Sequence, residues 1–307
     1  MKLNDRQFLN LIPPFCKIET AAVALLPVPY EGGTSYGKGT GKAPNSVIEA
    51  SHYLELFDEE FKAEPYRMGI TTIFPPKLSG NPAEVQKAIQ SSCSALIRDG
   101  KYVVLLGGDH SISVGYFMAL LEKHETISIV QLDAHADLRE TYEGSLFSHA
   151  CVMSRLRELT KSTLQIGIRS MSAQEADRIE REGLAVYTMA DYRKREARTK
   201  EFINKLPDPV FVTLDVDVFD WSVIRSTGTP EPGGLLWDEG LGLLKYIFLH
   251  KKVIGFDVVE LSHEENDRNS PFAVAKLIYK MLAFKLASYA GNDISDWPEK
   301  PIGAFLK

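Results

Sequence analysis

The sequence ISIVQLDAHAD at residues 127–137 joins an apolar, β-branched run to three potential metal ligands. Such a run predicts a buried strand. Alternate residues of an extended backbone point to the same side, so we expect Asp133, His135 and Asp137 to face one site. Imidazole and carboxylate groups are common ligands of divalent metal ions. The stretch therefore predicts a metal site at the end of a strand.

Two other apolar runs end in residues of the same kinds. Val210–Leu214 leads into Asp215 and Asp217, and Val103–Leu106 leads through two glycines to a further aspartate and His110. In open α/β sheets, sites form at the carboxyl ends of the strands, so we expect the three groups to meet. The six candidate ligands are His110, Asp133, His135, Asp137, Asp215 and Asp217.

This donor set is too large for one tetrahedral zinc site, which would also favour cysteine. It fits two divalent cations with bridging carboxylates. Manganese is the natural candidate for oxygen-rich ligation, with iron, cobalt and nickel as alternatives. Two such ions would lower the pKa of a shared water and make it a nucleophile near neutral pH. Polar residues also occur at strand ends simply because they favour turns, but three such clusters argue against that interpretation.

Strand patterns recur along the chain and alternate with helical ones, which predicts parallel pairing in a three-layer α/β/α fold with a mainly parallel sheet of about eight strands. The apolar runs are mostly continuous, as expected for strands buried on both faces. The strands are expected at Ala22–Leu26, Gly69–Phe74, Val103–Leu106, Ile127–Leu132, Leu164–Ile168, Leu184–Tyr187, Val210–Leu214 and Val253–Val258. The helices are expected at Pro82–Arg98, Ser113–Lys123, Ala173–Glu182, Asp238–Leu249 and Phe272–Ala290. We predict one domain over residues 1–307, with 1–20 a less certain N-terminal extension.

Composition excludes several classes of protein. The 307 residues are 44% hydrophobic and 25% charged, with a formal net charge of −6, and no basic domain suggests a nucleic-acid partner. No apolar run approaches the roughly 20 residues of a membrane span, and no signal-peptide pattern is evident. The three cysteines, Cys16, Cys93 and Cys151, have no disulfide-like spacing. We expect them to be buried and reduced, in a cytoplasmic protein.

Six blocks together resemble the ureohydrolase superfamily, which includes arginases, agmatinases, formiminoglutamases and guanidino-acid hydrolases. The blocks are GGDHS at 107–111, DAHAD at 133–137, SHA at 148–150, DVDVFD at 215–220, TGTPEPGG at 227–234 and DVVE at 257–260. They follow in order between about Pro27 and about Lys280. The resemblance implies an arginase-like fold, two manganese ions per chain, a small guanidino substrate, and a homotrimer or homohexamer.

The resemblance also implies a role for each matched residue. Asp133 and Asp215 match bridging carboxylates. Terminal ligands of one ion correspond to His110 and Asp137, and those of the other to His135 and Asp217. For catalysis, the matched residues are Asp137, which would hold the bridging nucleophile, His149, which would carry a proton to the leaving amine, and Glu260, which would bind the guanidinium.

Physical chemistry supports the last two assignments. A carboxylate such as Glu260 can hold a planar guanidinium by paired, charge-assisted hydrogen bonds. An amine leaves badly unless it is protonated, and an imidazole such as that of His149 titrates in the range suited to supplying that proton. Asp109 is expected to orient a ligand or its loop, and Asp220 to shape a turn.

The substrate is predicted from the loop after the DAHAD block. Arg139 stands where arginases usually carry asparagine, which argues against arginine. Residues 133–153 are instead similar to bacterial and archaeal agmatinases, so the most favoured reaction is agmatine to putrescine and urea. Glu143 is expected to meet the distal ammonium, and Thr229 is expected to contact the substrate.

Alternatives remain open at this point. Trp221 replaces a proline common in relatives, and Arg225 follows closely; a cation near the pocket would favour a guanidino acid. Other candidate substrates are guanidinobutyrate, guanidinopropionate, aminopropylagmatine and guanidine. Remoter alternatives are a one-zinc amide hydrolase and a non-catalytic metal-binding homologue, which would be expected to lack a ligand. Roles are not assigned to Arg139, Arg225, Arg169 (preferred as a salt-bridged strand-end residue) and His263 (a possible pocket-rim residue).

Overall fold

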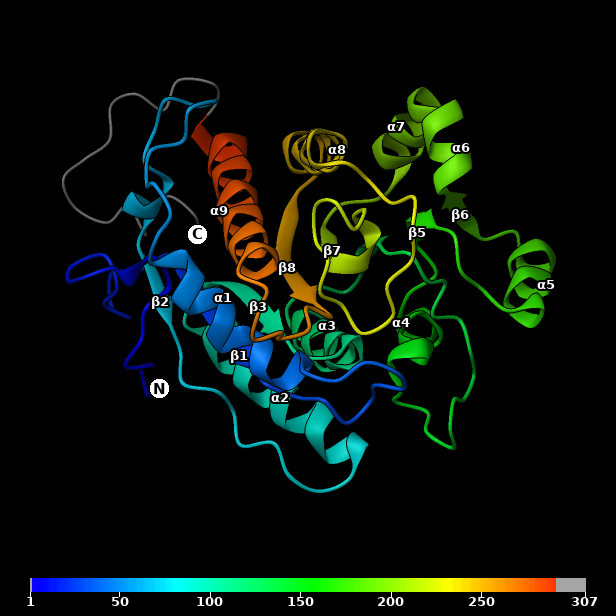
Figure 1. The fold of residues 1–307 in the computed structure, drawn as a ribbon, viewed down its shortest axis with the longest axis horizontal. Coiled ribbons are helices and arrows are strands. Elements are labelled where there is room, and N and C mark those ends of the chain that lie inside the picture. Colours follow the sequence, from blue (N-terminus) through cyan, green and yellow to red (C-terminus); the bar gives the residue numbers. More distant parts are fainter. Residues whose placement is uncertain (1, 291–307) are drawn as a thin grey trace.

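Eight parallel strands form the central sheet of the computed structural model, which describes residues 2–290 (Figure 1). Their order across the sheet is β2-β1-β3-β8-β7-β4-β5-β6. The strands are β1 (Val23–Val28), β2 (Ile70–Thr72), β3 (Tyr102–Gly107), β4 (Ser128–Leu132), β5 (Thr163–Ile168), β6 (Ala185–Thr188), β7 (Val210–Asp215) and β8 (Val253–Val259).

Helices cover both faces of this sheet (Figure 1). One face packs against α1 (Ala43–Ser51), α7 (Glu196–Lys205), α8 (Trp237–His250) and α9 (Asn269–Ala290). The other packs against α2 (Pro82–Arg98), α3 (Ser113–Leu121), α4 (Val152–Leu159) and α5 (Ala173–Glu182). Near the β6 edge lies α6 (Met189–Lys194). Short 3₁₀ helices are η1 (Phe8–Asn10), η2 (Thr40–Lys42), η3 (Pro65–Met68), η4 (His110–Ile112), η5 (His149–Cys151) and η6 (Val216–Val218).

The predicted α/β/α architecture and its eight strands are confirmed. Every residue of β1, β3, β4, β5 and β7 is buried, as continuous apolar runs require. The helices α2 and α5 have the predicted bounds because Asn81 and Ser172 form capping boxes at their starts. Four helices, α1, α4, α6 and α7, were not predicted; they have 6–10 residues, and helices this short leave a weak local signal.

The N-terminal residues pack against the β2 edge of the sheet. Phe8 and Leu9 are buried. Their backbone amides donate to Thr72 Oγ1 and Ser51 Oγ, each at 2.8 Å. This segment therefore covers the β2 edge of the sheet. At the other end of the chain, residues 291–307 of the predicted single domain lie outside the described residues.

Two further expectations concern burial and membranes. All three cysteines are free and buried, as predicted. Within residues 2–290, no helix is both long enough and apolar enough to cross a membrane.

Candidate active site

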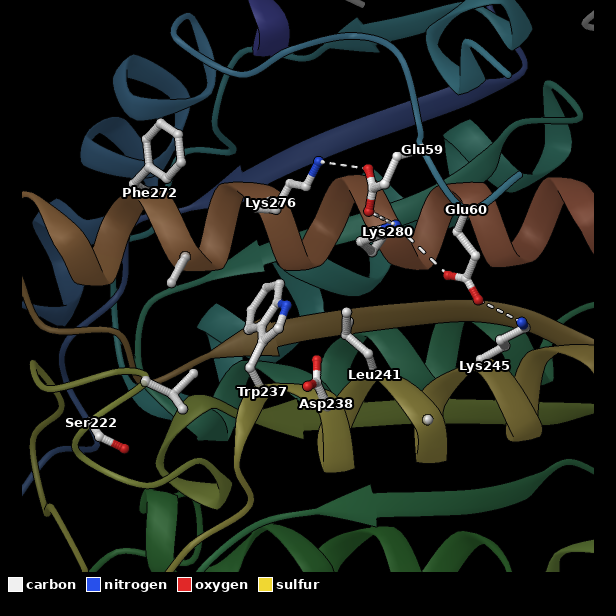
Figure 2. A pocket seen from close by; sticks show the side chains of 13 residues that line it. Glu59, Glu60, Ser222, Trp237, Asp238, Leu241, Lys245, Phe272, Lys276 and Lys280 are labelled. Carbon is white, nitrogen blue, oxygen red and sulfur yellow. Dashed lines mark hydrogen bonds and ion pairs between the residues drawn. The ribbon is translucent and has the colours of Figure 1, made fainter. Parts of the chain in front are cut away.

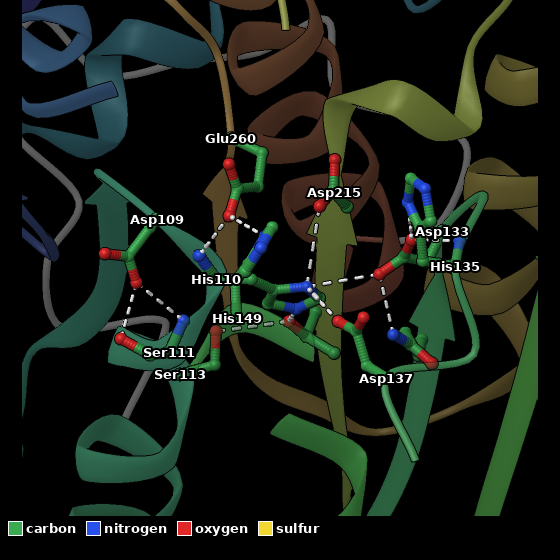
Figure 3. Close-up of polar contacts among 12 residues, drawn as sticks. Asp109, His110, Ser111, Ser113, Asp133, His135, Asp137, His149, Asp215 and Glu260 are labelled. Atoms are coloured by element: carbon green, nitrogen blue, oxygen red, sulfur yellow. Dashed lines mark hydrogen bonds and ion pairs between the residues drawn. The ribbon is translucent and has the colours of Figure 1, made fainter. Parts of the chain in front are cut away.

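Four neighbouring strands bring the predicted ligand clusters together. His110 follows β3, Glu260 follows β8, Asp215 ends β7 and Asp133 follows β4. These strands are consecutive in the sheet and parallel. Their carboxyl ends therefore meet at one edge, where the candidate residues converge (Figure 3).

The imidazole of His110 is the centre of the first ligand group. Its Nδ1 lies 3.1 Å from Asp133 Oδ2, 3.1 Å from Asp137 Oδ2 and 3.5 Å from Asp215 Oδ2 (Figure 3). All four side chains are buried. Nitrogen and oxygen donors this close together have room for one shared cation.

The second group forms around His135. Its Nδ1 lies 2.8 Å from Asp217 Oδ2 and 3.7 Å from Asp133 Oδ1. Asp133 thus turns one oxygen towards each histidine and belongs to both groups. This placement is the one that a carboxylate needs to bridge two ions.

Backbone amides fix the carboxylates in these orientations. The amide of His135 donates to Asp133 Oδ1 at 2.6 Å, and the amide of Ala134 donates to Asp217 Oδ1 at 2.9 Å. Similarly, Asp217 N donates to Asp215 Oδ1 at 2.9 Å. The opposite oxygens of Asp215 and Asp217 are left facing the histidines. The site is therefore preorganised by the local backbone.

A hydrogen-bond chain sets the tautomer of His110. Thr213 Oγ1 donates to Asp257 Oδ1 at 2.7 Å, so its oxygen can accept from His110 Nε2–H at 2.8 Å. Nδ1 is then left with its lone pair towards the carboxylates. Both this nitrogen and Asp217 Oδ2 are buried, and neither makes a hydrogen bond of regular geometry within residues 2–290, although Asp217 Oδ2 lies 2.8 Å from His135 Nδ1. Buried nitrogen and oxygen atoms with lone pairs available in this way are suited to metal ligation.

The cluster is electrostatically incomplete without cations. Burial and the charges of Asp137 and Asp217 raise the pKa of Asp133 to about 7. Burial and the charges of Asp217 and Asp133 hold the pKa of Asp215 well above its ordinary value. Although burial lowers the pKa of His135, the charge of Asp217 raises it to about 10. Positive charge at this cluster, on the two histidines or on bound cations, therefore stabilises the ionised carboxylates.

Metal loading is therefore expected to release protons and to strengthen as the pH rises. The ligand atoms must be deprotonated to bind a cation, and the raised pKa values of Asp133, about 7, and His135, about 10, favour the protonated forms of both groups below those pH values. Calorimetric titration with manganese in two buffers of different ionisation enthalpy measures the proton release. Loading without proton release, or with equal affinity at about pH 6 and about pH 8, would contradict this picture.

The metal-free protein should become less stable to unfolding as the pH rises. A raised pKa means that the folded state binds more protons than the unfolded chain. The contribution of Asp133 to folding stability is full below its ordinary pKa of 3.8 and is lost as the pH rises through its raised pKa of about 7. The contribution of His135 is full below its ordinary pKa of 6.5 and is lost as the pH rises through its raised pKa of about 10. Manganese should consequently raise the Tm more at about pH 8 than at about pH 6.

A histidine and a glutamate lie beside the ligand groups. Glu260 is 2% exposed and its Oε1 accepts from His110 N at 2.8 Å. His149 Nδ1 is 3.4 Å from the same oxygen (Figure 3). Although burial lowers the pKa of His149, hydrogen bonding to Glu260 raises it to about 9. The imidazole therefore carries a proton at neutral pH.

Three of the six non-glycine residues with positive φ within residues 2–290 are candidate catalytic or substrate-binding residues; the other three, Leu9, Asn10 and Lys62, lie elsewhere. Asp137, Glu143 and Glu260 have φ values of 52°, 48° and 65°, in the left-handed region. Such conformations cost about 1 kcal/mol or more for a residue with a side chain. They are typical of functional sites, where the surrounding structure holds a side chain in a required direction.

Comparison with known proteins identifies the family. A family model described as the arginase family matches residues 21–283. The chain belongs to the arginase family. Its two ligand groups fit the binuclear metal site for which this fold is known.

Proteins named as ureohydrolases and agmatinases are among those similar to the chain. An N(1)-aminopropylagmatine ureohydrolase of Synechocystis is 39% identical over 274 residues, covering 86% of this chain and 89% of the relative. An agmatinase of Pyrococcus horikoshii is 31% identical over 274 residues, covering 88% and 94%. The solved agmatine ureohydrolase of Thermoplasma volcanium superposes with a TM-score of 0.85 at 28% identity, covering 93% and 96%. The predicted resemblance is confirmed, and this arginase-family chain is a hydrolase of guanidino compounds.

The remaining predicted substrate residues lie in the loops between β4 and η5 and between η6 and α8. Glu143 is exposed and Thr229 is partly buried, next to Gly228. A Cβ built on Gly228 would lie 3.6 Å from Glu260 Oε2, so this loop approaches the guanidinium-binding candidate. The side chain of Arg225 is exposed, and its backbone amide donates to Ser270 Oγ at 3.0 Å.

One expectation about another residue needs correction. Arg169 was expected to form a salt bridge, but within residues 2–290 its guanidinium hydrogen-bonds backbone carbonyls, including those of Asp217 and Glu231. It secures two loops through these bonds. The position of His263 at the pocket rim stays a prediction; its Nδ1 is 2.7 Å from Ser46 Oγ. Arg139 stacks on the ring of Tyr142 at 4.9 Å.

Two aspartates have the structural roles expected of them. The carboxylate of Asp109 accepts from Gly33 N at 2.7 Å and from Ser111 N at 3.0 Å, so it orients loops. Asp220 accepts from Ser222 N and Gly233 N, at 3.0 and 3.1 Å, and shapes the turn after η6.

Sequence reasoning missed the loop after β1, residues 30–41. Five glycines in this loop were the available signal: Gly32, Gly33, Gly37, Gly39 and Gly41. The loop crosses the carboxyl end of the sheet, where Gly37 N donates to Gly228 O at 3.1 Å. It thereby joins the site that the strand ends create.

A cavity of about 740 Å³ lies elsewhere, between α8 and α9 (Figure 2). Its lining includes Trp237, Leu241 and Phe272, with Glu60 and Lys245 at one end. None of the six candidate ligands lines it. The ligand cluster and this cavity are therefore separate features of the molecule.

Proposed function

We propose that the protein hydrolyses the guanidino group of a cationic guanidinoalkylamine, with agmatine, giving putrescine and urea, as the first candidate. One observation carries the proposal: two ligand groups share Asp133 and lie beside a buried glutamate that contacts a histidine. The first element suits activation of water, the second suits recognition of a guanidinium and protonation of a leaving amine.

We propose two manganese ions as the cofactor. One would be held by His110, Asp133, Asp137 and Asp215, and the other by Asp133, His135, Asp215 and Asp217. When bound, they would supply an activated water and electrostatic stabilisation of the charge that develops during hydrolysis. The donor set supports manganese because carboxylate oxygens outnumber imidazole nitrogens.

In this proposal Glu260 binds the guanidinium. Its carboxylate is buried, which strengthens a charge-assisted hydrogen bond to a planar cation. The hydrogen bond from His110 N holds the side chain beside the first ligand group. Glu260 would consequently orient the central carbon of the guanidinium towards the ligand cluster.

His149 supplies the proton in the proposed reaction. Attack of water on the guanidinium carbon and cleavage of a C–N bond release urea and an amine, and the departing nitrogen must gain a proton. The pKa of His149, raised to about 9 by hydrogen bonding to Glu260 against the effect of burial, keeps it protonated at neutral pH. Its Nδ1 already faces the carboxylate that would hold the guanidinium.

N(1)-aminopropylagmatine is the second candidate substrate. The 39% identical Synechocystis relative carries that name, which favours it. Both candidates are polycations with a guanidinium at one end. In each case we propose that Thr229 contacts the substrate near the guanidinium and that Glu143 meets a distal ammonium.

Urea release from five compounds tests the proposal after manganese loading. The compounds are agmatine, N(1)-aminopropylagmatine, arginine, guanidinobutyrate and guanidine. We expect the highest kcat/KM with one of the first two. A preference for guanidinobutyrate or arginine would contradict the proposed cationic substrate class, and no urea from any of them would contradict the proposed chemistry.

Replacing Glu143 by glutamine is expected to lower kcat/KM for agmatine by roughly two- to fivefold, the scale of an exposed ion pair. Guanidine has no distal ammonium, so its turnover should not change. Glu140→Gln is the matched control because Glu140 pairs with Arg155 and Arg178 in the same loop region. Unchanged agmatine kinetics in Glu143→Gln would remove this residue from the proposal.

A further inference from the structure

The loop after β1 contacts the proposed proton donor through one side chain. Ser35 Oγ lies 3.0 Å from His149 Nε2. The other ring nitrogen, Nδ1, lies 3.4 Å from Glu260 Oε1. The imidazole of His149 is therefore held at both nitrogens, by residues from two different loops.

Backbone contacts fix this loop beside His149. Gly33 O accepts from His149 N and from Ser148 Oγ, both at 3.2 Å, while Gly33 N donates to Asp109 Oδ2 at 2.7 Å. A Cβ on Gly33 would lie 2.9 Å from Asp109 Oδ1 and 3.2 Å from His149 N. The approach thus requires glycine, two residues before Ser35.

The far end of the loop is also secured. Glu31 Oε2 accepts from Gly39 N at 2.8 Å and from Gly41 N at 2.9 Å, which closes the loop on itself. Gly37 N is bonded to Gly228 O on the other side of the site. Ser35 is therefore presented by a constrained segment, as required of a group that orients another side chain.

We propose that Ser35 is a positioning residue for His149. Its hydroxyl oxygen accepts the Nε2–H of the protonated ring and so directs Nδ1–H towards Glu260, where the guanidinium would bind. The proton given to the leaving nitrogen is the one on Nδ1; the Nε2 proton stays in the hydrogen bond to Ser35. This inference rests on the proposed role of His149 as proton donor.

The test compares Ser35→Thr with Ser35→Val in the manganese-loaded full chain, using the best substrate of the five compounds above. The two replacements have nearly the same shape and differ in the hydroxyl. We expect Ser35→Val to lower kcat roughly 10- to 100-fold, the scale of one hydrogen bond to a charged group, with KM and metal content unchanged. Ser35→Thr should retain most of the activity.

Thr34→Ala is the matched control on the same loop. Thr34 Oγ1 accepts from Lys38 Nζ at 2.8 Å instead of contacting the ring. Its removal should leave kcat unchanged. A loss in Thr34→Ala equal to that in Ser35→Val would indicate a general effect on the loop and would overturn the inference.

A double mutant separates positioning from other roles. In a His149→Ala background there is no ring to orient, so adding Ser35→Val should cause no further loss. A further loss as large as in the wild type would overturn the inference. If His149→Ala lowers kcat but Ser35→Val does not, the inference fails alone. If His149→Ala is fully active, the inference fails together with the proposed role of that histidine.

Discussion

Replacing Asp133 by alanine is expected to reduce the metal content from two ions to less than one per chain and to lower kcat for urea release by on the order of 1,000-fold or more. The reason is that Asp133 belongs to both ligand groups, with one oxygen 3.1 Å from His110 Nδ1 and the other 3.7 Å from His135 Nδ1. Metal analysis and steady-state kinetics on the same preparation measure both effects.

Asp220→Asn provides the control for this experiment. Asp220 is also an aspartate next to a candidate ligand segment, but it accepts from Ser222 and Gly233 and belongs to neither ligand group. It should keep two ions and its activity. One bound ion with undiminished turnover in Asp133→Ala would contradict the two-metal proposal.

Replacing His149 by alanine is expected to lower kcat on the order of 100- to 1,000-fold, the usual contribution of a general acid. The metal content should not change, because His149 belongs to neither ligand group. Its removal takes away the proton held at a pKa of about 9 next to Glu260. Kinetics at matched metal occupancy give the size of the loss.

A second histidine outside the cluster controls for imidazole removal. His263 bonds Ser46 and is partly buried, like His149. His263→Ala should retain turnover. If His149→Ala loses metal and activity in equal proportion, His149 has a structural role and the proposed proton transfer is wrong.

The strands could be predicted from the sequence because their signal is local. The runs around Val104, Val130 and Val212 are dominated by apolar residues, with Ser128, Gln131 and Thr213 as polar exceptions, and every residue of the three strands is buried in the structure. The short helices could not be predicted so well. In α4, Arg155 and Arg157 are buried with polar partners, which obscures the apolar face on which helix prediction depends.

The candidate site was largely predictable for a related reason. Ligand types at alternate positions directly after a strand, as in Asp133 and His135, require no knowledge of distant contacts. Strand order did require such knowledge, since nothing local places β8 between β3 and β7. Contacts across 114 residues, such as Ser35 with His149, depend on that order. The carbonyl contacts of Arg169 depend on it as well.

The position of β8 has a consequence for how the protein matures. It is the last strand within residues 2–290 and lies between β2-β1-β3 on one side and β7-β4-β5-β6 on the other. His110 belongs to the first half and Asp133 to the second, so the candidate metal site straddles the join. During synthesis the halves cannot be united before about residue 259 has emerged. The first ligand group, around His110, would therefore be completed only after β8 has joined the two halves, whereas the second group of Asp133, His135 and Asp217 lies wholly within the second half.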